Sequence, residues 1–363
     1  MAILTRIICG YGKARHDMTR DSTQNKTRIA LIGCGAWGKH IARNLAELGV
    51  LAAICDTDSA TAKAIAQSLD TPTLPLAEIE ADASIQGVAI ATPASSHAEL
   101  AVRFLAAGKH VYIEKPFALS LAEAEHLATT AKQANKHLMA GHLLRYHPAF
   151  LALQAEVAKG RIGRLTHISA MRLASGRVRA GESVLYDLTS HDLAMVYALT
   201  QNEGVGETVT QLTCHTIQHL ADTEADITTA LLQLKSGVSV HLHASWMHPT
   251  KIHTLTVIGD TGALVFDDTK PWAEKLRLYR NPVPPLDTLP DLAGENITVA
   301  EGEPLRHEML AFITTITDNT PPPTDIKEAL YVQRLLTELE AQAIAHTNAK
   351  PKPSQRRVSY AKL

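Results

Sequence analysis

The sequence is poor in cysteine and contains no long run of apolar residues. The 4 cysteines among its 363 residues form no C-x-x-C pair, so a disulfide framework is not indicated. No stretch reaches the roughly 20 apolar residues that a membrane-spanning helix needs, and the first residues do not resemble a secretory leader. These absences predict a cytoplasmic protein without a membrane anchor.

An excess of charge of one sign is also missing. The 35 Lys and Arg residues are balanced by 37 Asp and Glu residues, which leaves a formal net charge of -2. A nucleic-acid binder carries a basic patch, and a membrane-bound protein a basic surface, so the sequence favours neither nucleic acid nor membrane as a partner. The expected partner is a small molecule.

The order of the apolar runs predicts two folded domains between a flexible extension, residues 1–27, and a tail, residues 347–363. In residues 28–149, short apolar runs alternate with amphipathic helical patterns, which is typical of a Rossmann domain with a doubly wound parallel sheet. The expected strands are Ile29–Ile32, Val50–Cys55, Val88–Ala91, Val111–Ile113 and Leu138–Ala140.

Residues 150–346 follow a different pattern. In VSVHLHASW, residues 238–246, apolar and polar side chains alternate with the period of two that a strand requires. Several such runs predict an α+β domain built on a large open, mainly antiparallel sheet of about half a dozen strands. We expect this domain to bind the substrate, with its late helices packing back on the first domain.

The stretch GCGAWG places three glycines between the first expected strand and a helix. Gly33 allows the tight turn, Gly35 lets a pyrophosphate approach the backbone, and Gly38 lets the helix pack closely on the sheet. Ala36 and Trp37 would add backbone amides to the same anion site at the start of the helix. The alternative is a glycine turn that only packs a βαβ unit.

Asp56 ends the second expected strand. A carboxylate at this position accepts hydrogen bonds from the ribose hydroxyls of a dinucleotide and repels a 2′-phosphate. The following Thr57, Asp58 and Ser59 offer no cation. We therefore expect NAD as the cofactor rather than NADP, whereas the alternative is that Asp56 only caps the next helix.

Two polar corners follow the third and fourth expected strands, at the edge where ligands bind in open α/β sheets. The first corner, ATPASSH, contains Thr92, Pro93 and His97, and the second contains Glu114 and Lys115 before a proline. We expect all five residues to border the cofactor. A lysine held over the nicotinamide could stabilise an alkoxide, which hydride transfer at an alcohol carbon requires. The alternative is a solvated lysine paired with the glutamate.

A second pair of residues fits acid–base chemistry. Asp187 and His191 are four positions apart in a predicted helix, so they share a face and the carboxylate can orient the imidazole. This arrangement predicts a general base with its orienting acid. The alternative is an ordinary capped helix whose histidine is hydrogen-bonded between the domains.

Together, GCGAWG, ATPASSH, EKP and D-x-x-x-H resemble the Gfo/Idh/MocA family of sugar oxidoreductases in their order and spacing. The resemblance covers nearly all of residues 28–346. It implies that Lys115 is the active-site lysine, that His191 is the catalytic base and that Asp187 assists it. It also implies that the open sheet joins the subunits of a homodimer or homotetramer.

Longer stretches, such as MAGHLLRYHPAF and ASWMHPTKIHTLTVIGD, resemble the family branch of UDP-N-acetylglucosaminuronate 3-dehydrogenases. This resemblance implies oxidation of UDP-2-acetamido-2-deoxyglucuronate at C3, a step towards the sugars of surface polysaccharides. Some members of the branch keep the cofactor bound and reoxidise it with 2-oxoglutarate. The sequence departs from the branch at Tyr186, where a tryptophan is expected.

An anionic nucleotide sugar requires cations, and arginine suits a carboxylate or a diphosphate. Within or beside the stretches that resemble the branch, the substrate-binding candidates are Arg145, Tyr146, Arg172, Arg177 and Lys251. For each of the cations, the alternative is a role in the solubility of the surface.

Three other interpretations stay open. A metal site could use His241 and His243 on one face of an expected strand, but no acidic or cysteine ligand accompanies them, so no metal is expected. A dehydrogenase of the same fold could act on a free sugar or on a cyclitol such as inositol. A non-catalytic sensor of the same fold would have no use for Lys115, Asp187 and His191 together, which argues against this third interpretation.

Overall fold

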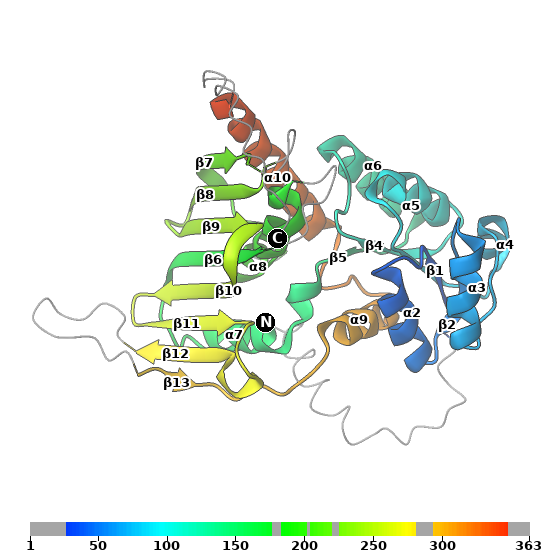
Figure 1. Cartoon of the computed structure of the whole chain (residues 1–363), viewed down its shortest axis with the longest axis horizontal. Helices are drawn as coiled ribbons and strands as arrows, with labels where there is room; N and C mark the ends of the chain where they lie inside the picture. The colour runs from blue at the N-terminus through cyan, green and yellow to red at the C-terminus, as the bar shows by residue number, and fades with distance from the viewer. Residues whose placement is uncertain (1–26, 176–182, 202–203, 220–224, 281–292, 348–363) are drawn as a thin grey trace, which may run out of the picture.

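The structure of the protein, a computed structural model, describes residues 27–175, 183–201, 204–219, 225–280 and 293–347. The extension and the tail expected from the sequence lie almost wholly outside the described residues, and Arg177 lies outside them too. Two sheets dominate the architecture: one has five parallel strands, and the other has eight mainly antiparallel strands (Figure 1). The predicted fold class, a Rossmann domain beside a large open sheet, is confirmed.

The first sheet has the strand order β2–β1–β3–β4–β5, and all its strands run parallel. Its strands are β1 (Ile29–Ile32), β2 (Leu51–Cys55), β3 (Gly87–Ile90), β4 (His110–Glu114) and β5 (Leu138–Gly141). Each expected strand agrees with the observed one to within one residue at either end. The apolar runs are continuous because helices cover both faces of the sheet.

The helices of this half are α2 (Gly38–Glu47), α3 (Ser59–Ser68), α4 (Leu76–Ala81), α5 (His97–Ala106) and α6 (Leu121–Ala134). Helices α5 and α6 pack on one face of the sheet, and α2 and α3 pack on the other (Figure 1). A capping box starts α6: Ser120 Oγ accepts the amide of Glu123 at 3.1 Å, and the Glu123 carboxylate accepts the amide of Leu119 at 2.9 Å.

The second sheet has the strand order β13–β12–β11–β10–β6–β9–β8–β7. Its strands are β6 (Leu165–Ser175), β7 (Val209–Ile217), β8 (Ile227–Leu234), β9 (Ser239–Ser245), β10 (Met247–Gly259), β11 (Gly262–Asp267), β12 (Leu276–Arg280) and β13 (Glu295–Asn296). The central pair, β6 and β9, is parallel, and the other pairs are antiparallel. The alternation expected for VSVHLHASW is observed, since Val240, Leu242 and Ala244 are buried.

Four further helices complete the fold: α7 (Pro148–Ala158), α8 (Ser190–Thr200), α9 (Pro304–Asp318) and α10 (Ile326–Thr347). Helices α7, α8 and α10 cover the inner face of the second sheet, whereas α9 packs beside α2 on the Rossmann sheet (Figure 1). None of the described helices is both long enough and apolar enough to cross a membrane. The described cysteines are free, so no disulfide between them joins these elements.

Candidate active site

The glycine turn has the shape that a dinucleotide pyrophosphate requires. Gly33 has a φ of +88°, and a Cβ there would lie 2.7 Å from the carbonyl carbon of Ala91. A Cβ on Gly38 would lie 2.1 Å from the carbonyl oxygen of Gly33, so the close approach of α2 needs glycine. At Gly35 a Cβ would meet no atom within 4 Å, which leaves open space at the turn.

The same turn offers hydrogen-bond donors. Within the described residues, the amides of Gly35, Ala36 and Trp37 have no backbone hydrogen-bond partner, and they precede the first turn of α2. Amides of this kind at a helix start bind an anion. The residues present therefore fit the pyrophosphate of NAD.

Asp56 lies directly after β2 at the same edge of the sheet. Its carboxylate accepts the amide of Cys34 at 2.7 Å and the amide of Asp58 at 2.9 Å. Burial acts to raise the pKa of Asp56, but these two hydrogen bonds lower it overall, so the group stays ionised at neutral pH. Each carboxylate oxygen has two acceptor sites, and a cavity of about 180 Å³ opens beside the residue. The ribose of NAD can therefore still bind there.

We expect Asp56→Ala to weaken NAD binding about 10- to 100-fold, because hydrogen bonds to a charged group contribute about 1.5–3 kcal/mol. Calorimetric titration with NAD measures the dissociation constant. Asp58→Ala is the matched control, since the Asp58 carboxylate accepts the amides of Ala60 and Thr61 at the start of α3. An unchanged dissociation constant for the Asp56 variant would remove this residue from the ribose site.

His97 connects the two corners that follow β3 and β4. Its ring nitrogens lie 2.8 Å from the carbonyl oxygen of Thr92 and 2.9 Å from that of Pro116. The ring is buried, and its two contacts hold the corners together. Pro93 directly precedes the short helix Ala94–Ser96, and the peptide bond before Pro116 is cis.

Lys115 from the Rossmann sheet meets Asp187 from the second half of the chain. The Lys115 ammonium forms an ion pair with the Asp187 carboxylate and also donates to the Asp187 carbonyl oxygen at 3.2 Å. The Lys115 and Asp187 side chains are only 16% and 9% exposed, so water screens the pair weakly. Trp246 donates its indole N–H to the other carboxylate oxygen at 3.1 Å. Two of the residues predicted to be catalytic are thus in direct contact.

The segment around Asp187 is not the regular α-helix that the spacing predicts. Residues Leu185–Thr189 form a π-helical turn, and α8 begins only at Ser190. The role of Asp187 rests on its bonds to Lys115 and Trp246.

His191 lies in the first turn of α8 and is half-buried. Its Nδ1 atom is buried and has no hydrogen-bond partner within the described residues. Burial, followed by the positive charges of Arg172 and Lys115, lowers the pKa of His191 well below its ordinary value. The imidazole is therefore neutral at neutral pH, which is the state that a proton acceptor requires.

Arg172 lies on β6 close to this histidine. Its guanidinium donates to the Asp192 carboxylate at 2.8 Å, and both side chains are buried. Of the other cations proposed to bind the substrate, Lys251 is exposed on β10, and Arg177 lies outside the described residues. Arg172 is therefore the cation of this set that the structure places beside His191.

Two other substrate candidates lie in the interior. Arg145 is buried and donates to Glu328 at 3.0 Å and to Gln154 at 3.1 Å. Tyr146 is buried as well, and its hydroxyl lies 2.9 Å from that of Thr324. These contacts join the end of the Rossmann sheet to the late part of the chain. The observed contacts of both residues are thus structural.

Local sequence patterns do not single out Asp192 or Trp246. Asp192 follows His191 directly in the stretch SHD, which is its only sequence signal. Trp246 ends the run VSVHLHASW, and its position in the alternation indicates only one more apolar strand residue. Both acquire their roles from partners on distant segments, Arg172 and Asp187 respectively.

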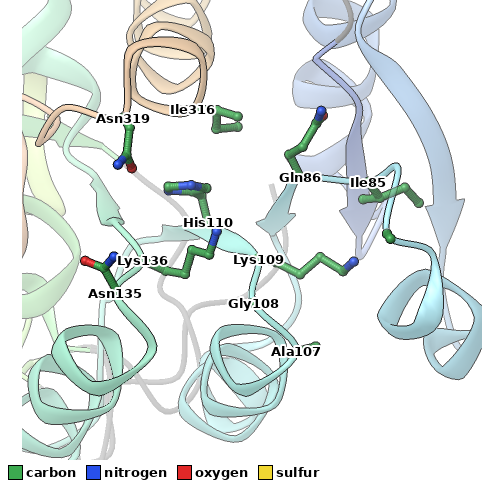
Figure 2. A pocket seen from close by; sticks show the side chains of 11 residues that line it. Ile85, Gln86, Ala107, Gly108, Lys109, His110, Asn135, Lys136, Ile316 and Asn319 are labelled. Carbon is green, nitrogen blue, oxygen red and sulfur yellow. The ribbon is translucent and has the colours of Figure 1, made fainter.

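A cavity of about 450 Å³ lies at the opposite edge of the Rossmann sheet, near the amino ends of β3, β4 and β5 (Figure 2). Lys109, His110 and Lys136 line it, and the carboxyl ends of α5, α6 and α9 meet there. Lysines near helix carboxyl ends interact favourably with the helix dipole. Because Lys109 donates to the carbonyl oxygen of Asp82, the C-cap of α4, at 2.7 Å, we assign Lys109 to helix capping.

The histidines of β9 lie on the outer face of the second sheet. His243 Nδ1 is 2.8 Å from the hydroxyl of Thr229 on the neighbouring strand, and His241 pairs with Leu231 in the register. Within the described parts of the chain, no group of three or more His, Cys, Asp or Glu side chains could hold a metal ion.

Comparison with known proteins adds independent findings. The family model described as oxidoreductase family, NAD-binding Rossmann fold, matches residues 27–142, and the model of the GFO/IDH/MocA C-terminal domain matches residues 150–265. The chain is 28% identical over 300 residues to UDP-N-acetylglucosamine 3-dehydrogenase from Acidithiobacillus ferrooxidans, which covers 81% of this chain and 90% of that protein.

Two further similarities bear on the substrate. The chain is 30% identical over 249 residues to myo-inositol dehydrogenase Hyg17 from Streptomyces leeuwenhoekii, which covers 65% of this chain and 75% of that protein. A solved structure of the Acidithiobacillus ferrooxidans enzyme matches with a TM-score of 0.77 at 25% identity, covering 88% of this chain and 97% of the other. A nucleotide-sugar enzyme and a cyclitol enzyme are thus both among the relatives.

Proposed function

Because the chain belongs to the Gfo/Idh/MocA family of oxidoreductases with an NAD-binding Rossmann fold, we propose that it oxidises a hydroxyl group of a nucleotide sugar. Lys115, Asp187 and His191 are the proposed catalytic residues. NAD is the cofactor and, when bound, supplies the hydride acceptor. The proposal rests mainly on the Lys115–Asp187 ion pair, which lies at the same edge of the Rossmann sheet as the glycine turn. It is supported by His191, whose pKa the nearby Lys115 charge helps to lower, so that the imidazole is neutral.

The proposed catalytic side chains have different roles at the hydroxyl group of the substrate. The neutral imidazole of His191 accepts the hydroxyl proton, and the Lys115 ammonium stabilises the negative charge that develops on the oxygen. Asp187 holds the ammonium in place and is itself held by the indole of Trp246. The Arg172–Asp192 pair fixes a further positive group near His191. The product carries a keto group where the hydroxyl stood.

The proposed substrate is UDP-2-acetamido-2-deoxyglucuronate, oxidised at C3. The similarity to UDP-N-acetylglucosamine 3-dehydrogenase supports a nucleotide sugar. Support for the carboxylate on the sugar comes from the sequence resemblance to the uronate branch, because Arg172 and Lys115 are each already paired with a carboxylate. A cyclitol such as myo-inositol is the second candidate, because the chain is 30% identical to a myo-inositol dehydrogenase.

Parallel substrates test this proposal. Purified protein with NAD and UDP-2-acetamido-2-deoxyglucuronate is expected to form a 3-keto product, detected by mass spectrometry together with the absorbance of the reduced cofactor. UDP-N-acetylglucosamine keeps the nucleotide but lacks the carboxylate, whereas myo-inositol lacks both, so the two controls remove the recognition features in steps. A product from myo-inositol alone would contradict a nucleotide-sugar substrate. Added 2-oxoglutarate shows whether that acid reoxidises the bound cofactor.

The outer face of the second sheet is the proposed contact between the subunits of a homodimer or homotetramer. Met171 and Leu231 are exposed on this face, at 36% and 54%, although both are large apolar side chains. Contiguous exposed apolar residues often mark protein interfaces. Light scattering measures the mass in solution, and a monomer at micromolar concentration would contradict this assembly.

A further inference from the structure

A buried chain of hydrogen bonds connects α9 to the cofactor edge of the Rossmann sheet. Tyr112 and Glu114 are two positions apart on β4 and therefore point to the same face. The Tyr112 hydroxyl oxygen lies 2.6 Å from Glu114 Oε1 and 3.2 Å from Oε2 of Glu308 on α9. Glu114 also accepts the indole N–H of Trp37 and the amide N–H of Lys115. The chain thus ends at the glycine turn and at the lysine corner.

The number of donors in this chain places a proton on Glu308. The indole of Trp37 and the amide of Lys115 can only donate, so Glu114 accepts from both. Tyr112 has a single O–H, which points to Glu114 as the nearer carboxylate. The contact between Tyr112 and Glu308 then needs another donor, and a protonated Glu308 carboxyl supplies it.

The electrostatics of the two acids agree with this count. Glu308 is 0% exposed, and burial, followed by the charge of Glu114, raises the pKa of Glu308 well above its ordinary value. Burial also raises the pKa of Glu114, but hydrogen bonds from Tyr112, Trp37 and the following amide favour its charged form. Two neighbouring buried carboxyl groups do not both ionise readily, so one proton stays with Glu308.

Helix α9 supports the glycine turn through a second contact. Glu303, which directly precedes α9, accepts a hydrogen bond from Asn44 at 3.1 Å and another from Arg43. Both donors lie on α2, the helix that begins at the glycine turn. Helix α9 therefore contacts the helix of the glycine turn and, through Glu308, the strand that carries the lysine corner.

We propose that Glu308 is a positioning residue of the cofactor site, which stays protonated and keeps Glu114 as the anion that holds Trp37 and the Lys115 corner in place. This inference rests on the proposed NAD-dependent function. Within the described residues, Glu308 Oε1 has no hydrogen-bond partner, which destabilises a buried acid. Glu308 therefore does not act by stabilising the fold. Its proposed contribution is to hold the proton, which leaves the negative charge on Glu114.

The protonation state is tested on the protein without cofactor. Difference infrared spectroscopy at neutral pH is expected to show the carbonyl band of a protonated carboxylic acid in the wild type and not in Glu308→Gln. The unfolded glutamate ionises above pH of about 4.3 while the folded one does not, so the wild type should lose stability relative to Glu308→Gln as the pH rises. A missing band in the wild type would overturn the proposal.

The positioning role is tested by breaking the chain at two points. Tyr112→Phe and Glu308→Leu are each expected to weaken NAD binding about tenfold in calorimetry, the size of one lost hydrogen bond. Both should also shift the indole N–H resonance of Trp37 in the cofactor-free protein. Glu308→Gln keeps a neutral donor, so it should restore the wild-type dissociation constant and resonance.

Tyr197→Phe is the matched control. Tyr197 is another buried tyrosine, whose hydroxyl donates to the carbonyl oxygen of Gly204 at 2.8 Å in the second half of the chain. This variant should lose thermal stability and keep its affinity for NAD. If Tyr112→Phe behaves in the same way, the chain is merely structural and the proposal fails. If the wild type does not bind NAD at all, the proposed function fails, whereas the infrared band and the Trp37 resonance still decide the role of Glu308.

Discussion

Lys115→Met is expected to lower turnover by about 10²- to 10³-fold, the loss seen when one donor to a developing oxyanion is removed. Methionine keeps most of the apolar stem but has no charge to stabilise the oxygen of the reacting hydroxyl. Binding of NAD should stay near normal, because the glycine turn and Asp56 are untouched. Steady-state kinetics with the nucleotide sugar and calorimetric titration with NAD measure the two effects separately.

Lys109→Met provides a matched control for this variant. Lys109 precedes β4 and Lys115 follows it, so the same substitution is made at opposite ends of one strand. Lys109 is 3% exposed and bonds to a backbone carbonyl, so its loss should affect stability but not turnover. Lys115→Met also removes the cation that pairs with the Asp187 carboxylate, which can cost up to about 3–5 kcal/mol, so thermal melting must accompany the kinetics. Wild-type turnover in a folded Lys115 variant would exclude a catalytic lysine.

The second large effect is expected for His191→Asn. Loss of a general base lowers turnover by about 10²- to 10⁴-fold, and asparagine keeps a polar side chain of similar reach without a basic nitrogen. Since the pKa of His191 lies well below its ordinary value, kcat/KM of the wild type should not fall as the pH drops through about 6.5. A fall centred near that value, absent from the variant, would contradict the half-buried, neutral imidazole.

The same pKa makes a prediction about stability. Below a pH of about 6.5 the unfolded chain binds a proton at His191 that the folded chain does not bind, so the stability contributed by this residue is present above that pH and is lost as the pH falls. Denaturant unfolding of the wild type should show a steeper loss on acidification than that of His191→Asn. His110→Asn is the control, because burial lowers the pKa of His110 to about 4 far from the cofactor edge. That variant should also flatten the acid dependence but keep normal turnover.

Much of the Rossmann half could be predicted because its signals are local. Apolar runs end at glycine or at polar corners, and each run forms a strand that is buried on both faces. The second sheet was predicted less completely. The charged strand β12 and the two-residue strand β13 carry no clear pattern of alternation, and the parallel pairing of β6 with β9 joins segments far apart in the chain.

The candidate site, too, could be predicted from the sequence only in part. The positions of Gly33 and Gly38 follow from the sequence, because a positive φ and a close helix contact leave no room for a side chain. Spacing alone also identified Lys115 and His191 as candidates. The sequence also paired Asp187 with His191, which stays a prediction. The folded chain adds an ion pair between Asp187 and Lys115, and a π-helical turn at Asp187 that no local pattern indicated.

By itself, the sequence determined the fold class, the NAD-binding turn and the catalytic candidates, because each depends on residues that are close together in the chain. Only the tertiary structure decided which charges are paired and which are buried. It placed Arg145 in the interior, brought Asp187 to the lysine and buried Glu308 beside Glu114, which raises the pKa of Glu308. Burial and electrostatic pairing depend on contacts between distant segments, and only the folded chain creates those contacts.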